Sequence, residues 1–152
     1  MTPGLWRLYR RQHGPGLDGI GGTFADGRWH ARGDRVVYFG ASAAIAVLER
    51  LAHIDPDLLP NDLQLAYYEF SQAVFPTAVN EVAALPRDWT ELEQVTRQIG
   101  EDWRRKRYSC LLTVPSVILP EESNFVYNPQ HPDAKWLRLV RERPFTFDPR
   151  LV

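Results

Sequence analysis

The stretch VVYFGASAAIAVLERLAH, from Val36 to His53, decides the fold. Its first part lies within the segment 35–41, which is apolar, β-branched and aromatic, as is typical of a buried β-strand. Ser42 is a favourable helix N-cap, and apolar residues recur at helical spacing behind it. The segment 43–54 is therefore predicted to be a helix. Its expected apolar stripe consists of Ala44, Leu48, Leu51 and Ala52.

Outside this stretch, strands are expected to outnumber helices. Strands are predicted at residues 63–70, 110–114, 117–119, 124–128, 136–140 and 145–147. Thr90 and Glu93 form the T-x-x-E pattern of a capping box, which predicts a helix that breaks at Gly100. The glycine-rich segment before Thr23 is expected to be a loop. The predicted class is α+β, a single compact domain over residues 1–152 with a mixed or antiparallel β core and few helices.

Composition limits the classes of function. The 152 residues are 44% hydrophobic, enough for one domain with a buried core. The net charge of −1 gives no bulk basic field, so direct nucleic-acid binding has no support. The single cysteine, Cys110, excludes an internal disulfide and suits a reducing compartment. No window approaches the ~18 apolar residues of a membrane span. The protein is therefore expected to be soluble and cytoplasmic, without membrane contact.

Glu49 is the unusual residue of the predicted helix. At ~100° per residue it lies about 40° from Ile45 and about 60° from Ala52, so its carboxylate leans towards the apolar stripe. His53 follows one turn later, at position i+4. A carboxylate that faces inward is costly unless it is paired or used in chemistry. The alternatives are that Glu49 reaches water at the edge of the stripe or pairs with Arg50.

Arg28 and Tyr38 are two further candidates for a binding site. Arg28 follows a glycine-rich loop, and a guanidinium there can bind a phosphate or carboxylate through two parallel hydrogen bonds. An exposed surface arginine is the alternative. Strand alternation points Tyr38 away from Val37 and Phe39, which is compatible with a pocket wall and equally with a core position.

The later part of the chain offers polar residues beside prolines. VPS at 114–116 places the Ser116 hydroxyl where a strand is interrupted, and Asn124 opens NFVYNPQHPD, a composition that is also typical of turns. Glu49, His53 and His131 would be the ligands of a metal site, but no H-E-x-x-H or comparable spacing is present. A Ser–His–acid triad on Ser116 lacks the G-x-S-x-G elbow. No metal is therefore predicted.

Taken together and in this order, these motifs resemble the RES-domain family. The matching segments are GRW at 27–29, the strand-to-helix stretch 36–53, VPS at 114–116, NFVYNPQHPD at 124–133 and FTFDPRL at 145–151. His30 departs from the family pattern, which commonly has asparagine after GRW.

The resemblance implies a fold similar to ADP-ribosyltransferase toxins and a role as the growth-arresting toxin of a bacterial type II toxin–antitoxin pair. The family's arginine, tyrosine and glutamate fall on Arg28, Tyr38 and Glu49, which are expected to be catalytic. Its serine falls on Ser116, and the positions expected to bind substrate are Trp29, His53, Ser116 and Asn124. The implied substrate is NAD, with inorganic phosphate as a candidate co-substrate and no cofactor. The implied partner is a helix-turn-helix antitoxin of the Xre type that blocks the cleft.

The expected reaction is cleavage of the nicotinamide–ribose bond, by hydrolysis or phosphorolysis. Departure of the base builds positive charge on the ribose, as in glycoside cleavage. Glu49 is expected to stabilise that charge, Arg28 to bind the pyrophosphate and Tyr38 to pack against the nicotinamide or its ribose. The alternatives are an ADP-ribosyltransferase that modifies a host protein, and a non-enzymatic interaction module. A ribonuclease toxin is a third, which the order of Arg28, Tyr38 and Glu49 does not favour.

Overall fold

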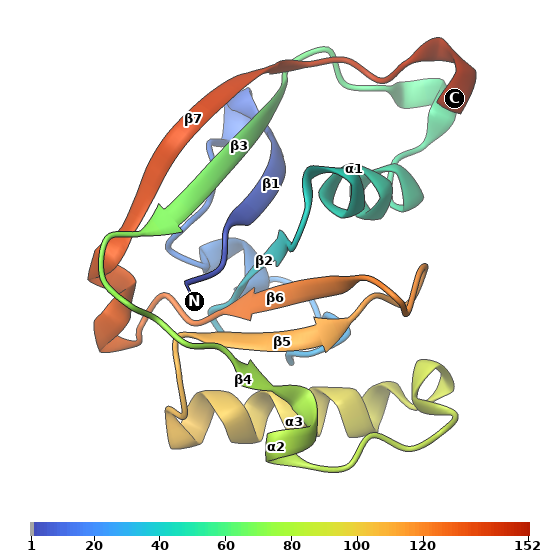
Figure 1. Ribbon diagram of the computed structural model, residues 1–152. Coiled ribbons are helices and arrows are strands. Elements are labelled where there is room, and N and C mark those ends of the chain that lie inside the picture. The colour runs from blue at the N-terminus through green and yellow to red at the C-terminus, as the bar shows by residue number, and fades with distance from the viewer. Residues whose placement is uncertain (1) are drawn as a thin grey trace.

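The chain folds around one twisted, seven-stranded β-sheet, seen in a computed structural model that describes residues 2–152 (Figure 1). The strands are β1 (Leu5–Arg10), β2 (Val37–Gly40), β3 (Leu63–Phe70), β4 (Thr77–Ala78), β5 (Leu111–Pro115), β6 (Ser123–Tyr127) and β7 (Leu137–Phe145). Their order across the sheet is β4-β5-β6-β2-β1-β3-β7, and only β4 and β5 run parallel. This mixed sheet confirms the predicted α+β class.

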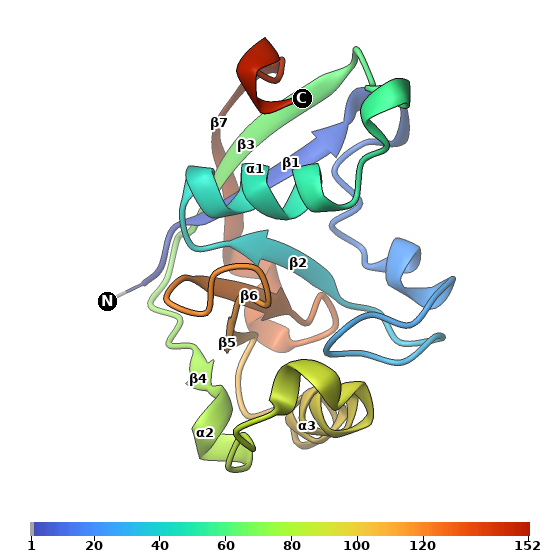
Figure 2. The same cartoon turned by 90° about the vertical axis from the view of Figure 1, so that its right-hand side faces the viewer.

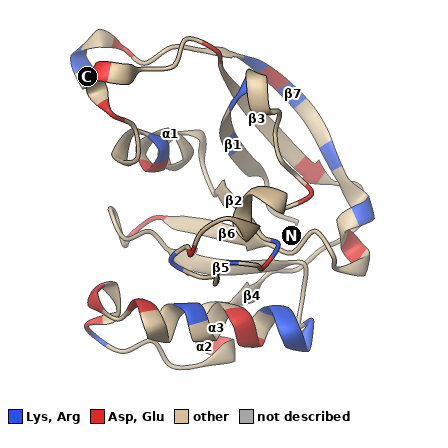
Figure 3. Ribbon diagram, turned by 180° about the vertical axis from the view of Figure 1, so that it is seen from behind, with Lys and Arg blue, Asp and Glu red and all other residues tan. Residues whose placement is uncertain are grey.

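The α-helices of the described residues are α1 (Ala43–Ala52), α2 (Val79–Val82) and α3 (Glu93–Lys106). Figure 2 shows α1 lying across β1 and β2, whereas α2 and α3 lie at the end of the sheet formed by β4 and β5. Basic and acidic residues are interspersed along α3 and β7 (Figure 3). Within residues 2–152, no helix is long and apolar enough to cross a membrane.

Three apolar clusters hold these layers together. α1 packs against β1 and β3 through Val47 and Leu51, and α3 packs against β5 and β6 through Ile99 and Trp103. A third cluster joins the central strands and includes Cys110, which is completely buried. Burial raises the pKa of the Cys110 thiol to about 12, and the nearby charge of a carboxylate adds to this effect.

The sheet opens between β1 and β2. β1 pairs with β3 along its whole length, but its only registered pair with β2, within the described residues, is Trp6 with Gly40. Arg7 bridges the opening, since its Nη1 donates to the Tyr38 carbonyl at 3.0 Å and its Nε donates to the Pro15 carbonyl at 2.7 Å. The two halves of the sheet are therefore joined loosely at its centre.

The sequence located the central elements well. The strand at 63–70 is confirmed at both ends, and the Ser42 side chain caps α1 by accepting from the Ile45 amide at 3.2 Å. The predicted apolar stripe is correct at Leu51, which packs on the core, but wrong at Ala44 and Ala52, which are exposed. α1 instead turns Val47 and its neighbours at helical spacing towards the core.

The predicted start and break of the second long helix are both wrong. Thr90 lies in a short 3₁₀ turn before α3, and no side chain caps the helix at Leu92. α3 also continues through Gly100. This glycine faces the Trp29 carbonyl, and a side chain at position 100 would overlap it. The glycine is therefore needed for close packing and does not interrupt the helix.

Three further differences concern strands. β1 was not predicted, although it is central to the sheet. Residues 117–119 form a bend instead of a strand, because Ser116 accepts hydrogen bonds from the amides of Ile118 and Leu119. The strand expected at 136–140 continues to Phe145 as one long strand, β7, which pairs with β3 through a register shift at Tyr67 and Tyr68. Of the strand expected at 145–147, only Phe145 belongs to β7.

Replacing Gly100 by alanine is expected to destabilise the protein. In an exposed helix this change would add about 1 kcal/mol of stability through helix propensity alone. Here the new methyl group overlaps the Trp29 carbonyl, and overpacking of this kind costs about 1–3 kcal/mol. Urea denaturation of Gly100→Ala measures the effect. Gly21→Ala is the matched control, since a Cβ there meets no atom within 4 Å. Equal or higher stability of Gly100→Ala would contradict the close contact.

Candidate active site

A cleft of about 360 Å³ lies at the opening between β1 and β2. One wall is α1, another is the GRW loop at residues 27–29, and the ends of β5 and β6 complete it. Six of the seven residues predicted for the site line this cleft: Arg28, Trp29, Tyr38, Glu49, His53 and Asn124. The structure thus gathers side chains that are up to 96 positions apart in the chain (Arg28 to Asn124, 124 − 28 = 96).

One face of α1 forms a wall of the cleft. Ala46, Glu49, Arg50 and His53 all line it, and they follow one another at positions i, i+3, i+4 and i+7. This face lies beside the one that packs on the core, so α1 serves as both a packing element and a carrier of polar groups. The inward lean predicted for Glu49 is therefore a lean into the cleft.

The Glu49 carboxylate is held by two donors on the same oxygen. The Ser116 hydroxyl donates to Oε1 at 2.6 Å, and the Asn124 amide nitrogen donates to it at 2.9 Å. Within residues 2–152 no hydrogen bond reaches the other oxygen, Oε2. The pairing with Arg50 considered from the sequence is absent from the ion pairs of this part of the chain. The carboxylate is thus fixed in position while one oxygen stays available to a molecule in the cleft.

Ser116 lies behind Glu49 and is completely buried. Its Oγ accepts from the Ile118 amide at 3.1 Å and from the Leu119 amide at 3.2 Å, which leaves its proton to donate to Glu49. Ser116 was expected to contact substrate, yet it is the one predicted site residue that does not line the cleft. Its place in the structure is that of a positioning residue for Glu49.

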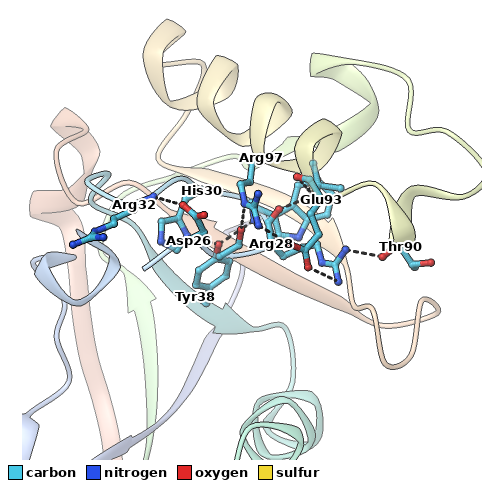
Figure 4. A network of polar contacts seen from close by, with 11 residues as sticks. Asp26, Arg28, His30, Arg32, Tyr38, Thr90, Glu93 and Arg97 are labelled. Atoms are coloured by element: carbon cyan, nitrogen blue, oxygen red, sulfur yellow. Dashed lines mark hydrogen bonds and ion pairs between the residues drawn. The ribbon is translucent and has the colours of Figure 1, made fainter. Parts of the chain in front are cut away.

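Tyr38 is fixed by a short chain of hydrogen bonds (Figure 4). The Nε2 of His30 lies 2.9 Å from the Gly22 carbonyl, which can only accept, so Nε2 carries the proton. In the neutral ring Nδ1 then accepts from the Tyr38 hydroxyl at 2.7 Å, and the Trp29 amide donates to the same hydroxyl at 3.2 Å. Burial raises the pKa of Tyr38, so the hydroxyl stays protonated at neutral pH.

The GRW loop is tied to α3 on its other side. The Arg28 Nη1 donates to the Thr90 carbonyl at 2.8 Å, and its Nη2 lies 3.6 Å from the Glu93 carboxylate. The Thr96 hydroxyl donates to the Arg28 carbonyl at 2.6 Å, and Arg97 donates to the Gly27 carbonyl at 3.0 Å (Figure 4). Arg28 therefore reaches the cleft from a loop whose backbone is anchored by the helix.

His53 and Trp29 occupy opposite environments. The His53 ring is exposed, and its Nδ1 donates to the Glu49 carbonyl at 2.7 Å, so its Nε2 is an acceptor when the ring is neutral. Trp29 is buried with the apolar cluster of α3 and lies 6.0 Å from the ring centre of Trp89. Trp29 thus belongs to a buried apolar cluster and lines the cleft at the edge of that cluster.

Arg7 and Arg50 line the cleft but were not predicted. Arg50 lies three positions before His53, a spacing that puts both on one helix face and was a usable signal for Arg50. Arg7 had none, since its place depends on the separation of β1 from β2. Burial lowers the pKa of Arg7 to about 10 and also lowers the pKa of Arg50, and in each case a neighbouring arginine adds to the shift. Both side chains are charged at neutral pH, because the guanidinium group of arginine is not deprotonated in proteins.

His131, one of the three residues weighed and set aside as metal ligands from the sequence, has a structural role. The His131 ring caps a 3₁₀ turn at residues 132–136, where its Nδ1 accepts from the Asp133 amide at 3.0 Å. Among residues 2–152, no three histidine, cysteine, aspartate or glutamate side chains lie close enough together to hold a metal ion. Glu49, His53 and His131 therefore do not form a cluster of ligands in this part of the chain.

Fold and site together match one family of toxins. The family model described as the RES domain matches residues 4–148, so the chain belongs to the RES-domain family. It is 36% identical to a Prs ADP-ribosylating toxin of a Sphingobium species, over 100% of this chain and 98% of that protein. It is also 36% identical to Toxin Res of Pseudomonas putida, over 97% and 98%, and 34% identical to Toxin Res of Photorhabdus laumondii, over 97% and 96%.

The fold has a counterpart among solved structures. It resembles a chain of the M. tuberculosis MbcT–MbcA toxin–antitoxin complex with a TM-score of 0.76 and 15% identity, over 96% of this chain and 85% of that chain. At this identity the likeness concerns the fold alone. With the family match, it makes this chain a toxin of the RES-domain type with an α+β fold.

Ser116→Ala is expected to cost about 1–3 kcal/mol of stability, because two backbone amides lose their acceptor and Glu49 loses a donor. Thermal unfolding measures this loss. Ser71→Ala is the control, because Ser71 is exposed and makes no side-chain hydrogen bond within the described residues. A change below about 0.5 kcal/mol in Ser116→Ala, like that expected for a surface site, would show that the network is not formed.

Proposed function

We propose that this chain cleaves NAD at the nicotinamide–ribose bond and acts as the toxin half of a toxin–antitoxin pair. The observation that carries the proposal is the Glu49 carboxylate, fixed through one oxygen and open through the other, in a cleft lined by three arginines. A fixed negative charge beside positive ones suits a substrate that develops positive charge at one end and carries phosphates at the other.

The chemistry follows from the bond that breaks. When the bond from the ribose C1′ to the nicotinamide nitrogen breaks, the electron pair leaves with nicotinamide, whose ring thereby becomes neutral. Positive charge then builds on the ribose, and an acceptor oxygen adds to C1′. The Oε2 of Glu49 would accept from the ribose hydroxyls and stabilise that charge. Ser116 and Asn124 hold the carboxylate so that it need not reorganise during the reaction.

The rest of the cleft supplies binding groups. Arg28 is held by Thr90 and Glu93 and still has free donors for the pyrophosphate, which guanidinium groups bind well. The Tyr38 ring, fixed by its hydroxyl, forms a flat surface on which the nicotinamide or its ribose can pack. His53 lies at the exposed side of the cleft, where it would orient the substrate or the acceptor.

The acceptor distinguishes two versions of this function. Water or inorganic phosphate as acceptor makes the chain an NAD-degrading toxin. A protein side chain as acceptor makes it an ADP-ribosyltransferase, and the name of the Sphingobium relative, an ADP-ribosylating toxin, favours this second candidate. NAD labelled in its adenosine part separates them, since the label ends on protein only in the second case.

We further propose that a helix-turn-helix antitoxin of the Xre type covers the cleft. Support comes from the likeness of the fold to a chain of a toxin–antitoxin complex. Support also comes from exposed apolar side chains beside Ser116, where Val117, Ile118 and Leu119 are 38%, 37% and 42% exposed. An apolar partner surface laid over them would close the side of the cleft that Val117 lines.

Replacing Glu49 by glutamine is expected to abolish NAD consumption while leaving the fold intact, because shape is kept and the negative charge is lost. Loss of one preorganised electrostatic group typically lowers turnover about 10²–10³-fold. Mass spectrometry of the products, with and without inorganic phosphate, measures turnover and identifies the acceptor. Glu81→Gln, an exposed residue of α2, is the control. Full activity of Glu49→Gln would refute the proposed role.

Arg28→Gln is expected to weaken NAD binding about tenfold, as loss of a charge-assisted hydrogen bond would. Calorimetry in the Glu49→Gln background measures affinity without turnover. Arg105→Gln removes an exposed arginine of α3 and should bind NAD as the parent does. Unchanged affinity in Arg28→Gln, with lower thermal stability, would show that Arg28 only anchors the loop.

A further inference from the structure

Within residues 2–152, Arg7 and Arg50 are guanidinium groups that form no ion pair with a carboxylate. Arg10, Arg97 and Arg104 each form an ion pair at 2.6–2.9 Å. For Arg7 and Arg50, no carboxylate of residues 2–152 lies within the 4.0 Å that defines an ion pair. These two side chains are nevertheless both partly buried and both line the same cleft.

The hydrogen bonds of the two groups are also incomplete. Arg7 uses Nε and Nη1 to hold two backbone carbonyls, which leaves further N–H groups of its five unassigned. The Nε of Arg50 is buried and has no hydrogen-bond partner within the described chain. A buried charged donor without an acceptor costs free energy. The charge of Arg50 adds to this cost at Arg7, and the charge of Arg10 adds to it at Arg50, where Asp62 acts in the opposite direction. An anion between the two groups would remove both costs.

Their position indicates what kind of anion fits. Arg50 follows Glu49 on the same face of α1, and Arg7 lies at the opening between β1 and β2. Arg28, by contrast, projects from the GRW loop and is already engaged by Thr90 and Glu93. The cleft therefore has a second cationic region beside its carboxylate. Two guanidiniums offer several donors from different directions, which suits a tetrahedral oxyanion with up to two negative charges.

We propose that Arg7 and Arg50 form an oxyanion subsite that takes a phosphate group. Two sources supply this chemistry: a phosphate of the dinucleotide, or free inorganic phosphate that serves as acceptor. The choice between these sources rests on the proposed function, whereas anion binding is measurable without any turnover. In the second case the phosphate lies next to the carboxylate that stabilises the ribose cation, with its oxygen available to form the new bond to C1′.

Arg50→Gln tests the subsite, because Arg50 makes no side-chain hydrogen bond within residues 2–152 whose loss would unfold the protein. Its thermal midpoint without ligand is expected to equal or exceed that of the parent. Affinity for the anion is expected to fall at least about tenfold. The probes are inorganic phosphate and NAD, each titrated by calorimetry into the Glu49→Gln protein with and without Arg50→Gln. Arg105→Gln is the control of equal charge change.

The two sources give different results. If phosphate and NAD compete, and Arg50→Gln weakens both, the subsite holds a phosphate of the dinucleotide. If they bind together, and Arg50→Gln weakens only phosphate, the subsite holds the acceptor. Weakened NAD binding in Arg50→Gln, with no measurable binding of free phosphate, also places the dinucleotide there. Equal affinities for both probes with and without Arg50 would overturn the subsite. Absence of NAD turnover in the wild type would refute the proposed function without affecting this result.

Discussion

The separation of β1 from β2 is the constraint on which the cleft depends. The two strands lie side by side in the sheet, but their registered pairing is limited to Trp6 and Gly40. A continuous ladder would fill the space that the cleft occupies and would displace Arg7 from its two carbonyl partners. Each half of the sheet therefore needs its own support, which α1 gives to β1 and β3 and α3 gives to β5 and β6.

The site joins both halves of the sheet through polar contacts. Glu49 comes from α1, while its two donors, Ser116 and Asn124, come from the segments at the ends of β5 and β6. Arg28 and Tyr38 are held by a second network, which runs from the Gly22 carbonyl through His30 and Tyr38 and also ties the GRW loop to α3. The carboxylate and the arginine thus belong to separately anchored networks on different walls of the cleft. This arrangement fixes the distance between negative and positive groups before any molecule binds.

Local signals predicted the parts of the fold that local rules control. The Ser42 cap, the helix behind it and the strand at 63–70 follow from propensity and periodicity, and they were found. β1 was missed because LWRLYR has an arginine at every third position and lacks the two-residue alternation typical of a strand; it becomes a strand of the sheet through pairing with β3. Gly100 was wrongly predicted to break the helix. A glycine is needed there because the Trp29 carbonyl, 71 positions earlier in the chain (100 − 29 = 71), packs against it.

The residues of the site also divide into those that sequence motifs predict and those that depend on contacts between distant parts of the chain. Arg28, Tyr38, Glu49 and Asn124 were identified by motif resemblance, and the structure places all four on one cleft. The resemblance did not reveal that Ser116 acts from behind the carboxylate, since motif order carries no information on burial. It also gave no sign of Arg7, because no local pattern reports that two neighbouring strands part.

The completely buried Cys110 has a consequence for how the protein responds to oxidants. Oxidation of a cysteine requires the thiolate, and the thiol of Cys110 is both shielded and held protonated by a pKa of about 12. Its sulfur instead makes a weak contact with the Asn128 carbonyl at 3.6 Å. The folded chain is thereby insulated from peroxide and from disulfide exchange at its single cysteine. Redox stress reaches this thiol only by way of unfolding.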